Sequence, residues 1–292
     1  MARQRQADLL LIVTTILAAF GWVFSREAIS GMPTYAFLGI RFTCAALIML
    51  PFCRGAGLRR EHWRPMLISG ALFALNLCLW VFSLSVSPTL SEGAFIMSLS
   101  MVFVPLTAWA MMRTRPSRAY WECLPVAIVG LALLSLQIPI HTHPSQGWWL
   151  LTAAGQSIWF VYSSNRAREV PLLPLSAVQM GMTGIAGVTI SLTTETWTQP
   201  MTLPVFGWLA ASILITTCLR FAVQLRGQKY AAVANAAIIM MLEPVFTALA
   251  ATLWYGEQLP PQKIAGGVLI IVAQVWFRWR VVREQRRRPF LE

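Results

Sequence analysis

The chain has 292 residues, of which 57% are hydrophobic and only 12% are charged, and its mean hydropathy is +0.62. A soluble protein of this length carries about 25% charged residues, so the composition excludes a soluble enzyme. The net charge of +12 does not indicate nucleic-acid binding, because the basic residues form short clusters between apolar runs. A protein that crosses a lipid bilayer several times is the first hypothesis.

Ten apolar runs follow one another along the chain, each about long enough to cross a bilayer as a helix. They occupy residues 8–28, 34–53, 65–86, 90–112, 119–138, 148–166, 172–192, 204–226, 233–255 and 262–280. Strands of a membrane barrel are about ten residues long and alternate apolar with polar positions, and these runs do not alternate. The sequence therefore predicts an all-α membrane protein with ten transmembrane helices and both termini on one side.

The distribution of lysine and arginine predicts the orientation of these helices. The links on the side of the two termini hold 19 of the 23 basic residues, whereas the links on the other side hold only Arg26 and Lys263. Because links rich in positive charge stay in the cytoplasm, we expect both termini to be cytoplasmic. Trp148 and Trp149 open the sixth run and are expected in an aromatic belt at the outer interface.

An internal repeat relates the fourth and ninth runs. Residues 94–108, AFIMSLSMVFVPLTA, align without a gap with residues 237–251, AIIMMLEPVFTALAA, and eight of the fifteen positions are identical. The match predicts two units of five helices, residues 1–143 and 144–292. Because five is odd, the second unit is expected to be inverted in the membrane. Inverted repeats around a central site are typical of secondary transporters that work by alternating access, although a duplicated bundle without transport is the alternative.

Motifs in both units resemble a known family. The segment LEPVFTALAATLWYGEQL at residues 242–259, followed by GGVLII, resembles the signature of the EamA-like drug/metabolite transporters. In the first unit, GWVFSREA at residues 21–28, LGIRF around Arg41 and FIMSLSMVFVPL at residues 95–106 are similar to the family pattern. The resemblance covers nearly the whole chain.

One branch of this family is similar in having two glutamines, here Gln224 and Gln228, before the Glu-Pro motif. The chain departs from the pattern at Arg26, where a lysine is common, and at Arg113-Thr114, where the first unit often has Gly-Glu. The resemblance implies a ten-helix transporter of the inner membrane that exports amino acids, related small metabolites or toxic compounds.

Charged residues inside the predicted spans are the first candidates for a site, because a charge in hydrocarbon costs about 2.5–3.5 kcal/mol. Arg41 is interpreted as a cavity-facing contact for a substrate carboxylate, which a guanidinium can bind through two hydrogen bonds; the alternative is a side chain that snorkels outward. Glu243 precedes Pro244, which predicts a helix break, and is either a proton-coupling group or a structural contact. Arg220 either pairs with Glu243 or snorkels inward.

Neutral polar and aromatic side chains complete the predicted substrate-binding set. Asn76, Gln179 and Gln224 supply hydrogen-bonding groups in the third, seventh and eighth spans, with hydrogen bonding between helices as the alternative. Trp22 and Trp159 hold similar positions in the first and sixth spans and are predicted to line a cavity, with lipid-facing positions as the alternative.

Other classes of function have little support in the sequence. The three histidines show no metal-ligand or acid-base spacing, and no phosphate-binding loop or nucleophile elbow occurs, so we expect no enzyme activity, cofactor or metal. The five cysteines show no disulfide or metal pattern. The expected partners are a small-molecule substrate and the lipid bilayer, without nucleic acid, and a homodimer is left open. A channel or a non-transporting scaffold is the alternative to a carrier.

Overall fold

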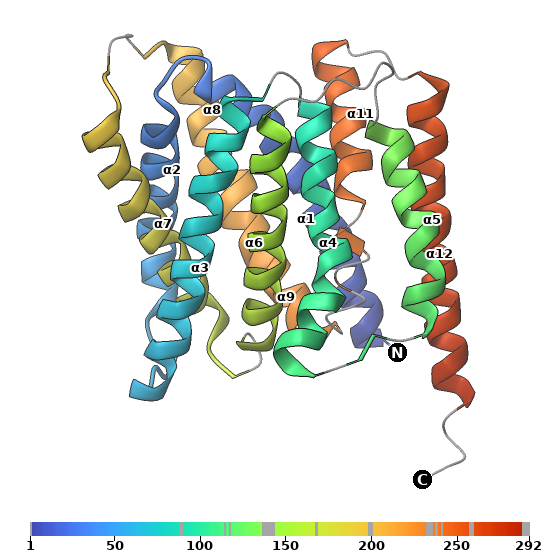
Figure 1. Cartoon of the computed structure of the whole chain (residues 1–292). Helices are drawn as coiled ribbons and strands as arrows, with labels where there is room; N and C mark the ends of the chain where they lie inside the picture. The colour runs from blue at the N-terminus through green and yellow to red at the C-terminus, as the bar shows by residue number, and fades with distance from the viewer. Residues whose placement is uncertain are drawn as a thin grey trace.

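Helices form all the regular structure in the part of the chain that the computed structural model describes, which is residues 2–87, 90–113, 115–116, 118–135, 144–166, 169–197, 201–231, 236, 239–240, 242–256 and 260–287. In chain order they are α1 (Ala2–Ile29), α2 (Thr34–Met49), η1 (Leu50–Cys53), α3 (Arg60–Ser85), α4 (Leu90–Met112), α5 (Arg118–Ser135), α6 (Ser145–Arg166), α7 (Leu172–Thr194), α8 (Leu203–Ile213), η2 (Leu214–Leu219), α9 (Arg220–Tyr230), α11 (Glu243–Tyr255) and α12 (Pro261–Arg287). They stand side by side in one bundle, in which α1 begins and α12 ends at the same end (Figure 1).

The predicted spans coincide with helices in the described residues. Within the described residues, five stretches are long and apolar enough to cross a bilayer by length and composition, namely Arg5–Ile29, Thr34–Cys53, Arg60–Ser85, Leu172–Thr194 and Leu203–Tyr230. Shorter apolar helical stretches occur at Val102–Met112, Val245–Tyr255 and Ile264–Phe277. Helix α6 is rich in polar residues, among them the buried Thr152, Ser157 and Ser163. The structure is thus an all-α membrane fold.

Helices α2 and α7 lie antiparallel in close contact. Glu195, which follows α7, accepts a hydrogen bond from the backbone N–H of Tyr35 at the start of α2, at 2.8 Å. About two turns further along α2, a Cβ added to Gly184 would lie 2.6 Å from the backbone nitrogen of Thr43. Small residues permit such backbone approach between membrane helices. The second and seventh spans therefore run in opposite directions.

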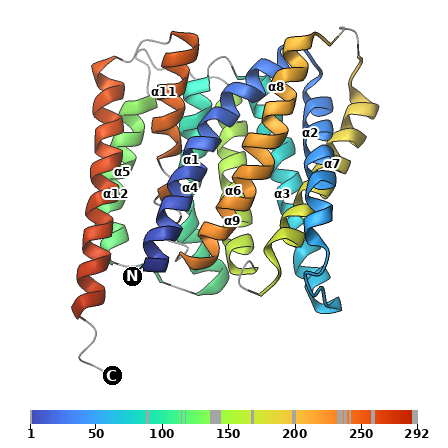
Figure 2. The ribbon, with the colours of Figure 1, turned by 180° about the vertical axis from the view of Figure 1, so that it is seen from behind.

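Contacts between the two halves come in matching pairs. Helix α3 packs against α6 and α7, as α8 packs against α1 and α2; α4 packs against α6, as α11 packs against α1; and α2 packs against α7 and α5 against α12. Exchanging each span for the one five spans later reproduces this set of contacts. Helices α1, α8 and α9 lie on one side of the bundle, and α3, α4 and α6 lie on the other, as the views from the two sides show (Figure 1 and Figure 2).

The ends of α4 and α11 repeat the same local geometry. Arg113 follows α4 with φ 55°, and Gly256 follows α11 with φ 64°, and the two residues are separated by the offset of the internal repeat. A left-handed residue after a helix is usually glycine. The two repeats therefore share this backbone conformation, although the first has arginine where the second has glycine.

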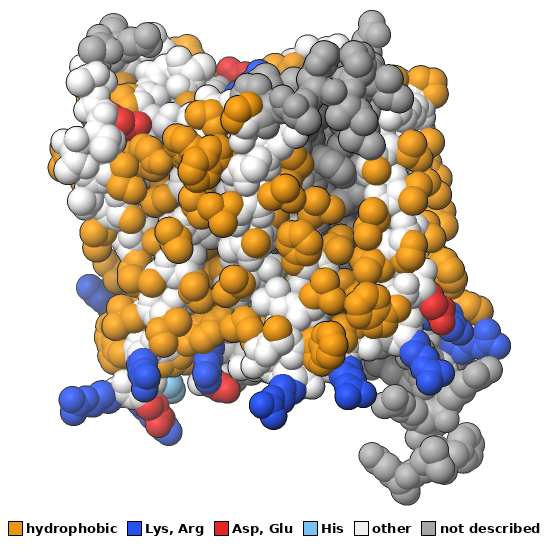
Figure 3. Space-filling view, viewed as in Figure 1, with side chains coloured by type: hydrophobic (Ala, Val, Ile, Leu, Met, Phe, Trp, Pro, Cys, Tyr) orange, Lys and Arg blue, Asp and Glu red, His pale blue; other side chains and the backbone are white. Residues whose placement is uncertain are grey.

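The surface carries an apolar band with basic side chains at one end. In the space-filling view, lysine and arginine gather at the end where α1 begins (Figure 3). Trp148 is half-exposed, but the prediction of an interfacial belt is wrong for Trp149, which is fully buried and packs on Trp22 with ring centroids 5.6 Å apart. Hydropathy cannot distinguish adjacent residues, although they point about 100° apart on a helix.

Candidate substrate-binding site

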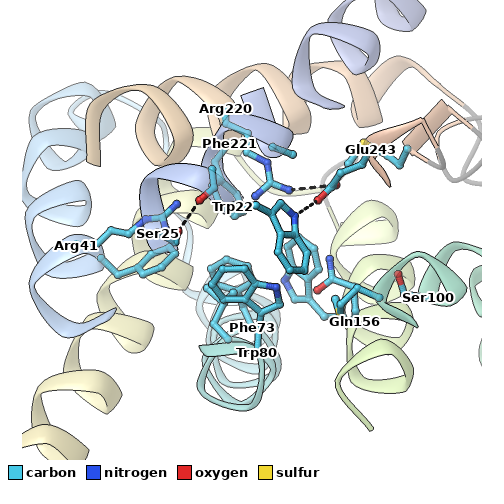
Figure 4. A pocket seen from close by; sticks show the side chains of 17 residues that line it. Trp22, Ser25, Arg41, Phe73, Trp80, Ser100, Gln156, Arg220, Phe221 and Glu243 are labelled. Atoms are coloured by element: carbon cyan, nitrogen blue, oxygen red, sulfur yellow. Dashed lines mark hydrogen bonds and ion pairs between the residues drawn. The ribbon is translucent and has the colours of Figure 1, made fainter. Parts of the chain in front are cut away.

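A cavity of about 80 Å³ lies between the two halves. Helices α1, α2, α3 and α4 line it from the first half, and α6, α9 and α11 line it from the second. This volume has room for roughly five to eight water molecules. The close-up shows charged groups and aromatic rings meeting around it (Figure 4).

Arg41 reaches the cavity from α2 and is only 5% exposed. Its Nε donates to Thr217 Oγ1 at 2.6 Å, Nη1 donates to Ser25 Oγ at 2.8 Å, and Nη2 donates to Thr216 Oγ1 at 3.1 Å. Its guanidinium carbon also lies 5.3 Å from the ring centroid of Phe42. The side chain is held inside the protein, so it does not snorkel outward.

A π-helical segment, η2, positions two of these partners. Thr216 and Thr217 are neighbours in η2, and both hydroxyls donate to the carbonyl of Ser212, at 3.1 and 2.8 Å. The wide turn brings both hydroxyls to the same guanidinium. Isolated π turns within longer helices are frequent at functional sites.

Glu243 reaches the cavity from the first residue of α11. Its Oε1 accepts a hydrogen bond from Trp22 Nε1 at 3.0 Å, and its Oε2 lies 4.0 Å from Arg220 Nη2 (Figure 4). Pro244 stands in the first turn of α11, where the missing N–H would have no helical partner; its side chain lies outside the described residues. Glu243 therefore connects α1, α9 and α11.

Aromatic rings form much of the remaining wall. Trp22 contacts Trp80 edge-on at 5.2 Å, and Phe73 lies 4.8 Å from Trp159 and 5.1 Å from Phe221 between ring centroids. All five line the cavity. Offset and edge-on pairs contribute about 0.5–1.5 kcal/mol each beyond burial, so this wall is a packed surface.

Five of the residues named from sequence come together at the cavity, namely Trp22, Arg41, Trp159, Arg220 and Glu243. Of the two alternatives for Arg220, pairing with Glu243 or snorkelling inward, the structure shows the pair.

The three predicted amides are not among the residues that line the cavity. Asn76 donates through Nδ2 to Gln156 Oε1, and Gln156 lines the cavity. Gln179 donates to Ser69 Oγ and Ser163 Oγ at 2.8 and 3.0 Å, and so connects α3, α6 and α7.

The third amide, Gln224, is buried in α9 and is not part of the lining, and its Oε1 has no hydrogen-bond partner within the described ranges.

Sequence reasoning missed several hydroxyl and amide groups of the site. Ser25, Thr216 and Thr217 hold Arg41, and Gln156 lines the cavity. Serine and threonine are common in membrane helices, where they also bond to their own backbone. The only available signal was the polar pair Thr216-Thr217 within an apolar span.

Comparison with known proteins identifies the family of the chain. The model of the EamA-like transporter family matches residues 5–136 and again residues 145–278. The chain belongs to the EamA-like transporter family. This EamA-like chain is 24% identical over 284 residues to a protein of Archaeoglobus fulgidus described as an uncharacterized transporter, covering 94% of this chain and 97% of the relative.

A solved crystal structure has the same fold. It matches with a TM-score of 0.75 over 94% of the EamA-like chain and 97% of its own, at 17% sequence identity. At that identity the likeness supports the fold alone. Family membership, the fold and the apolar helices together support a multi-pass membrane transporter.

Proposed function

We propose that the protein is a secondary transporter of the inner membrane that exports small metabolites or toxic compounds by alternating access. In this proposal both termini are cytoplasmic, and the two repeats are inverted relative to one another. The basic end of the bundle supports the orientation. The antiparallel packing of α2 on α7 supports the inversion.

The observation that carries the proposal is a cavity with buried charges whose lining is shared by both repeats. Arg41 comes from the first repeat, and Arg220 and Glu243 come from the second. Charges this deep in a membrane protein are costly and mark substrate or ion pathways. Relative movement of the two halves would expose such a cavity to one side of the membrane and then to the other.

Flux measurements with purified protein in lipid vesicles test this function. We expect saturable uptake of at least one compound from a panel of metabolites, with counterflow when the same compound is present inside. Flux that does not saturate would indicate a channel, and absence of flux for the whole panel would favour a scaffold.

The panel of metabolites is chosen by comparing cells that overproduce the protein with cells that lack it. For an exporter, we expect the substrate to accumulate outside the overproducing cells.

A further inference from the structure

The charges around the cavity do not balance. Two cations, Arg41 and Arg220, line it, but Glu243 is the only carboxylate in its described lining. That carboxylate is engaged by Trp22 and Arg220. Arg41 is in none of the ion pairs found in the described part of the chain, and its partners are neutral hydroxyl groups and a carbonyl. The cavity therefore has an excess of one positive charge at low dielectric, where a lone cation is costly.

Hydrogen-bond donors are also in excess. Trp159 is 1% exposed, and its Nε1 has no acceptor among the described residues; the Nε of Arg220 is likewise buried without an acceptor in that part of the chain. Both residues line the cavity. Buried donors without partners cost about 1–3 kcal/mol each. An ammonium group in the cavity would add further donors to this lining, whereas a carboxylate brings acceptors only.

The rest of the lining suits an apolar body. Phe42, Phe73, Trp80 and Phe221 surround the cavity with aromatic surface. Binding sites of this kind bury the apolar part of a ligand and orient it with a few polar groups. The small volume favours a compact molecule.

We propose that the cavity binds a small monocarboxylate with an apolar or aromatic body, whose carboxylate lies at Arg41 and supplies the missing negative charge. The proposal rests on the proposed transport function and narrows its substrate class. It ranks simple carboxylic acids above the corresponding amino acids, because the described lining offers no free carboxylate to an α-ammonium group.

Three compounds with the same phenyl body separate the charge classes. The first, 3-phenylpropanoate, carries only a carboxylate, and the second, phenethylamine, carries only an ammonium group. The third, phenylalanine, carries both. Binding to purified full-length protein in detergent is measured by calorimetry. We expect 3-phenylpropanoate to bind about tenfold more tightly than phenylalanine, because the ammonium group of phenylalanine finds no partner and a tenfold ratio of affinities corresponds to about 1.4 kcal/mol. Phenethylamine is expected to bind most weakly.

Two variants test the role of the charges. Arg41→Gln removes the charge while keeping a polar side chain, and we expect it to weaken 3-phenylpropanoate binding at least about tenfold and to remove the preference over phenylalanine. Glu243→Gln makes the cavity more positive, so the preference for the acid is expected to persist or increase. Binding of the acid to wild type but not to Arg41→Gln in the same detergent excludes partition into the micelle.

Several outcomes would overturn the charge assignment. It is wrong if phenylalanine or phenethylamine binds as tightly as the acid, if Arg41→Gln leaves the preference unchanged, or if none of the three compounds binds. Vesicle flux reports separately on transport. Saturable flux of another metabolite with no binding of the acid would refute the substrate class alone, whereas binding of the acid without any flux would refute the transport function alone.

Discussion

At the scale of single residues, the hydroxyl groups that bind Arg41 have hydrogen-bond acceptors of their own. Ser25 Oγ donates to the carbonyl of Gly21 at 2.5 Å, and Thr217 Oγ1 donates to the carbonyl of Ser212 at 2.8 Å. Each hydroxyl therefore uses its proton on its own helix and offers a lone pair to the guanidinium. The arginine can be removed without leaving these donors unpaired, which makes it suitable for a test of function.

For Arg41→Ala we expect the protein to fold. The KM for carboxylate substrates should rise about ten- to a hundredfold, because a hydrogen bond to a charged group contributes about 1.5–3 kcal/mol. Vesicle uptake and thermal unfolding measure the two effects. Arg59→Ala, at an exposed ion pair with Glu61, is the matched control and should leave uptake unchanged. Equal loss for uncharged substrates would instead indicate a structural role for Arg41.

Glu243 is a structural contact or a proton-coupling group, and its bonds to Trp22 and Arg220 favour the first. For Glu243→Gln we expect the free energy of unfolding to fall by about 1–2 kcal/mol, because Arg220 loses its carboxylate, and any dependence of transport on a pH gradient to persist. Glu122→Gln, at the half-exposed pair with Arg280, should cost less than about 1 kcal/mol. Loss of the pH-gradient dependence at unchanged stability would make Glu243 the coupling group.

At the scale of helices, the α2 and α7 pair depends on glycine. A Cβ added to Gly39 would lie 2.6 Å from the backbone nitrogen of Val188, and one added to Gly187 would lie 2.6 Å from the nitrogen of Gly39. These contacts are with backbone, so no side-chain rotation can relieve them. Together they keep the second and seventh spans, one from each half, in backbone contact.

We expect Gly39→Ala to lower the free energy of unfolding by about 1–3 kcal/mol, because overpacking forces α2 and α7 apart. Gly207→Ala in α8 is the matched control, since an added Cβ there meets no atom within 4 Å; it should be neutral or stabilising by up to about 1 kcal/mol. Thermal unfolding in the same detergent compares the two. An equal effect of both substitutions would show that helix approach does not limit stability at Gly39.

At the scale of the whole molecule, the basic end of the bundle predicts its orientation in the membrane. Leu58 lies in the link between η1 and α3 at the basic end, and Trp197 follows α7; both are exposed. Because basic links stay in the cytoplasm, Leu58 is expected inside and Trp197 outside.

Single cysteines at these two positions test the orientation in a protein whose five native cysteines have been replaced. A membrane-impermeant maleimide added to intact cells should label Trp197→Cys and leave Leu58→Cys unlabelled, and both should react after permeabilisation. The reverse pattern would contradict cytoplasmic termini.

The sequence by itself determined the class of fold, because run length and hydropathy respond to the bilayer and need no knowledge of contacts. It also predicted Arg41 and Glu243 as site candidates, since a charge within an apolar span stands out in one dimension. The internal match of residues 94–108 with residues 237–251 likewise indicated two units. Each of these signals is local or periodic along the chain.

Only the tertiary structure decided which polar groups share the cavity. Gln179 and Gln156 look alike in sequence, yet Gln156 lines the cavity, whereas Gln179 does not and bonds to Ser69 and Ser163. Trp149 is buried beside an exposed Trp148, and the π turn of η2 directs Thr217 to Arg41. These outcomes depend on helix rotation and on contacts between residues far apart in sequence, which hydropathy does not record. The charge excess of the cavity arises in the same way, because its cations and its carboxylate come from different helices.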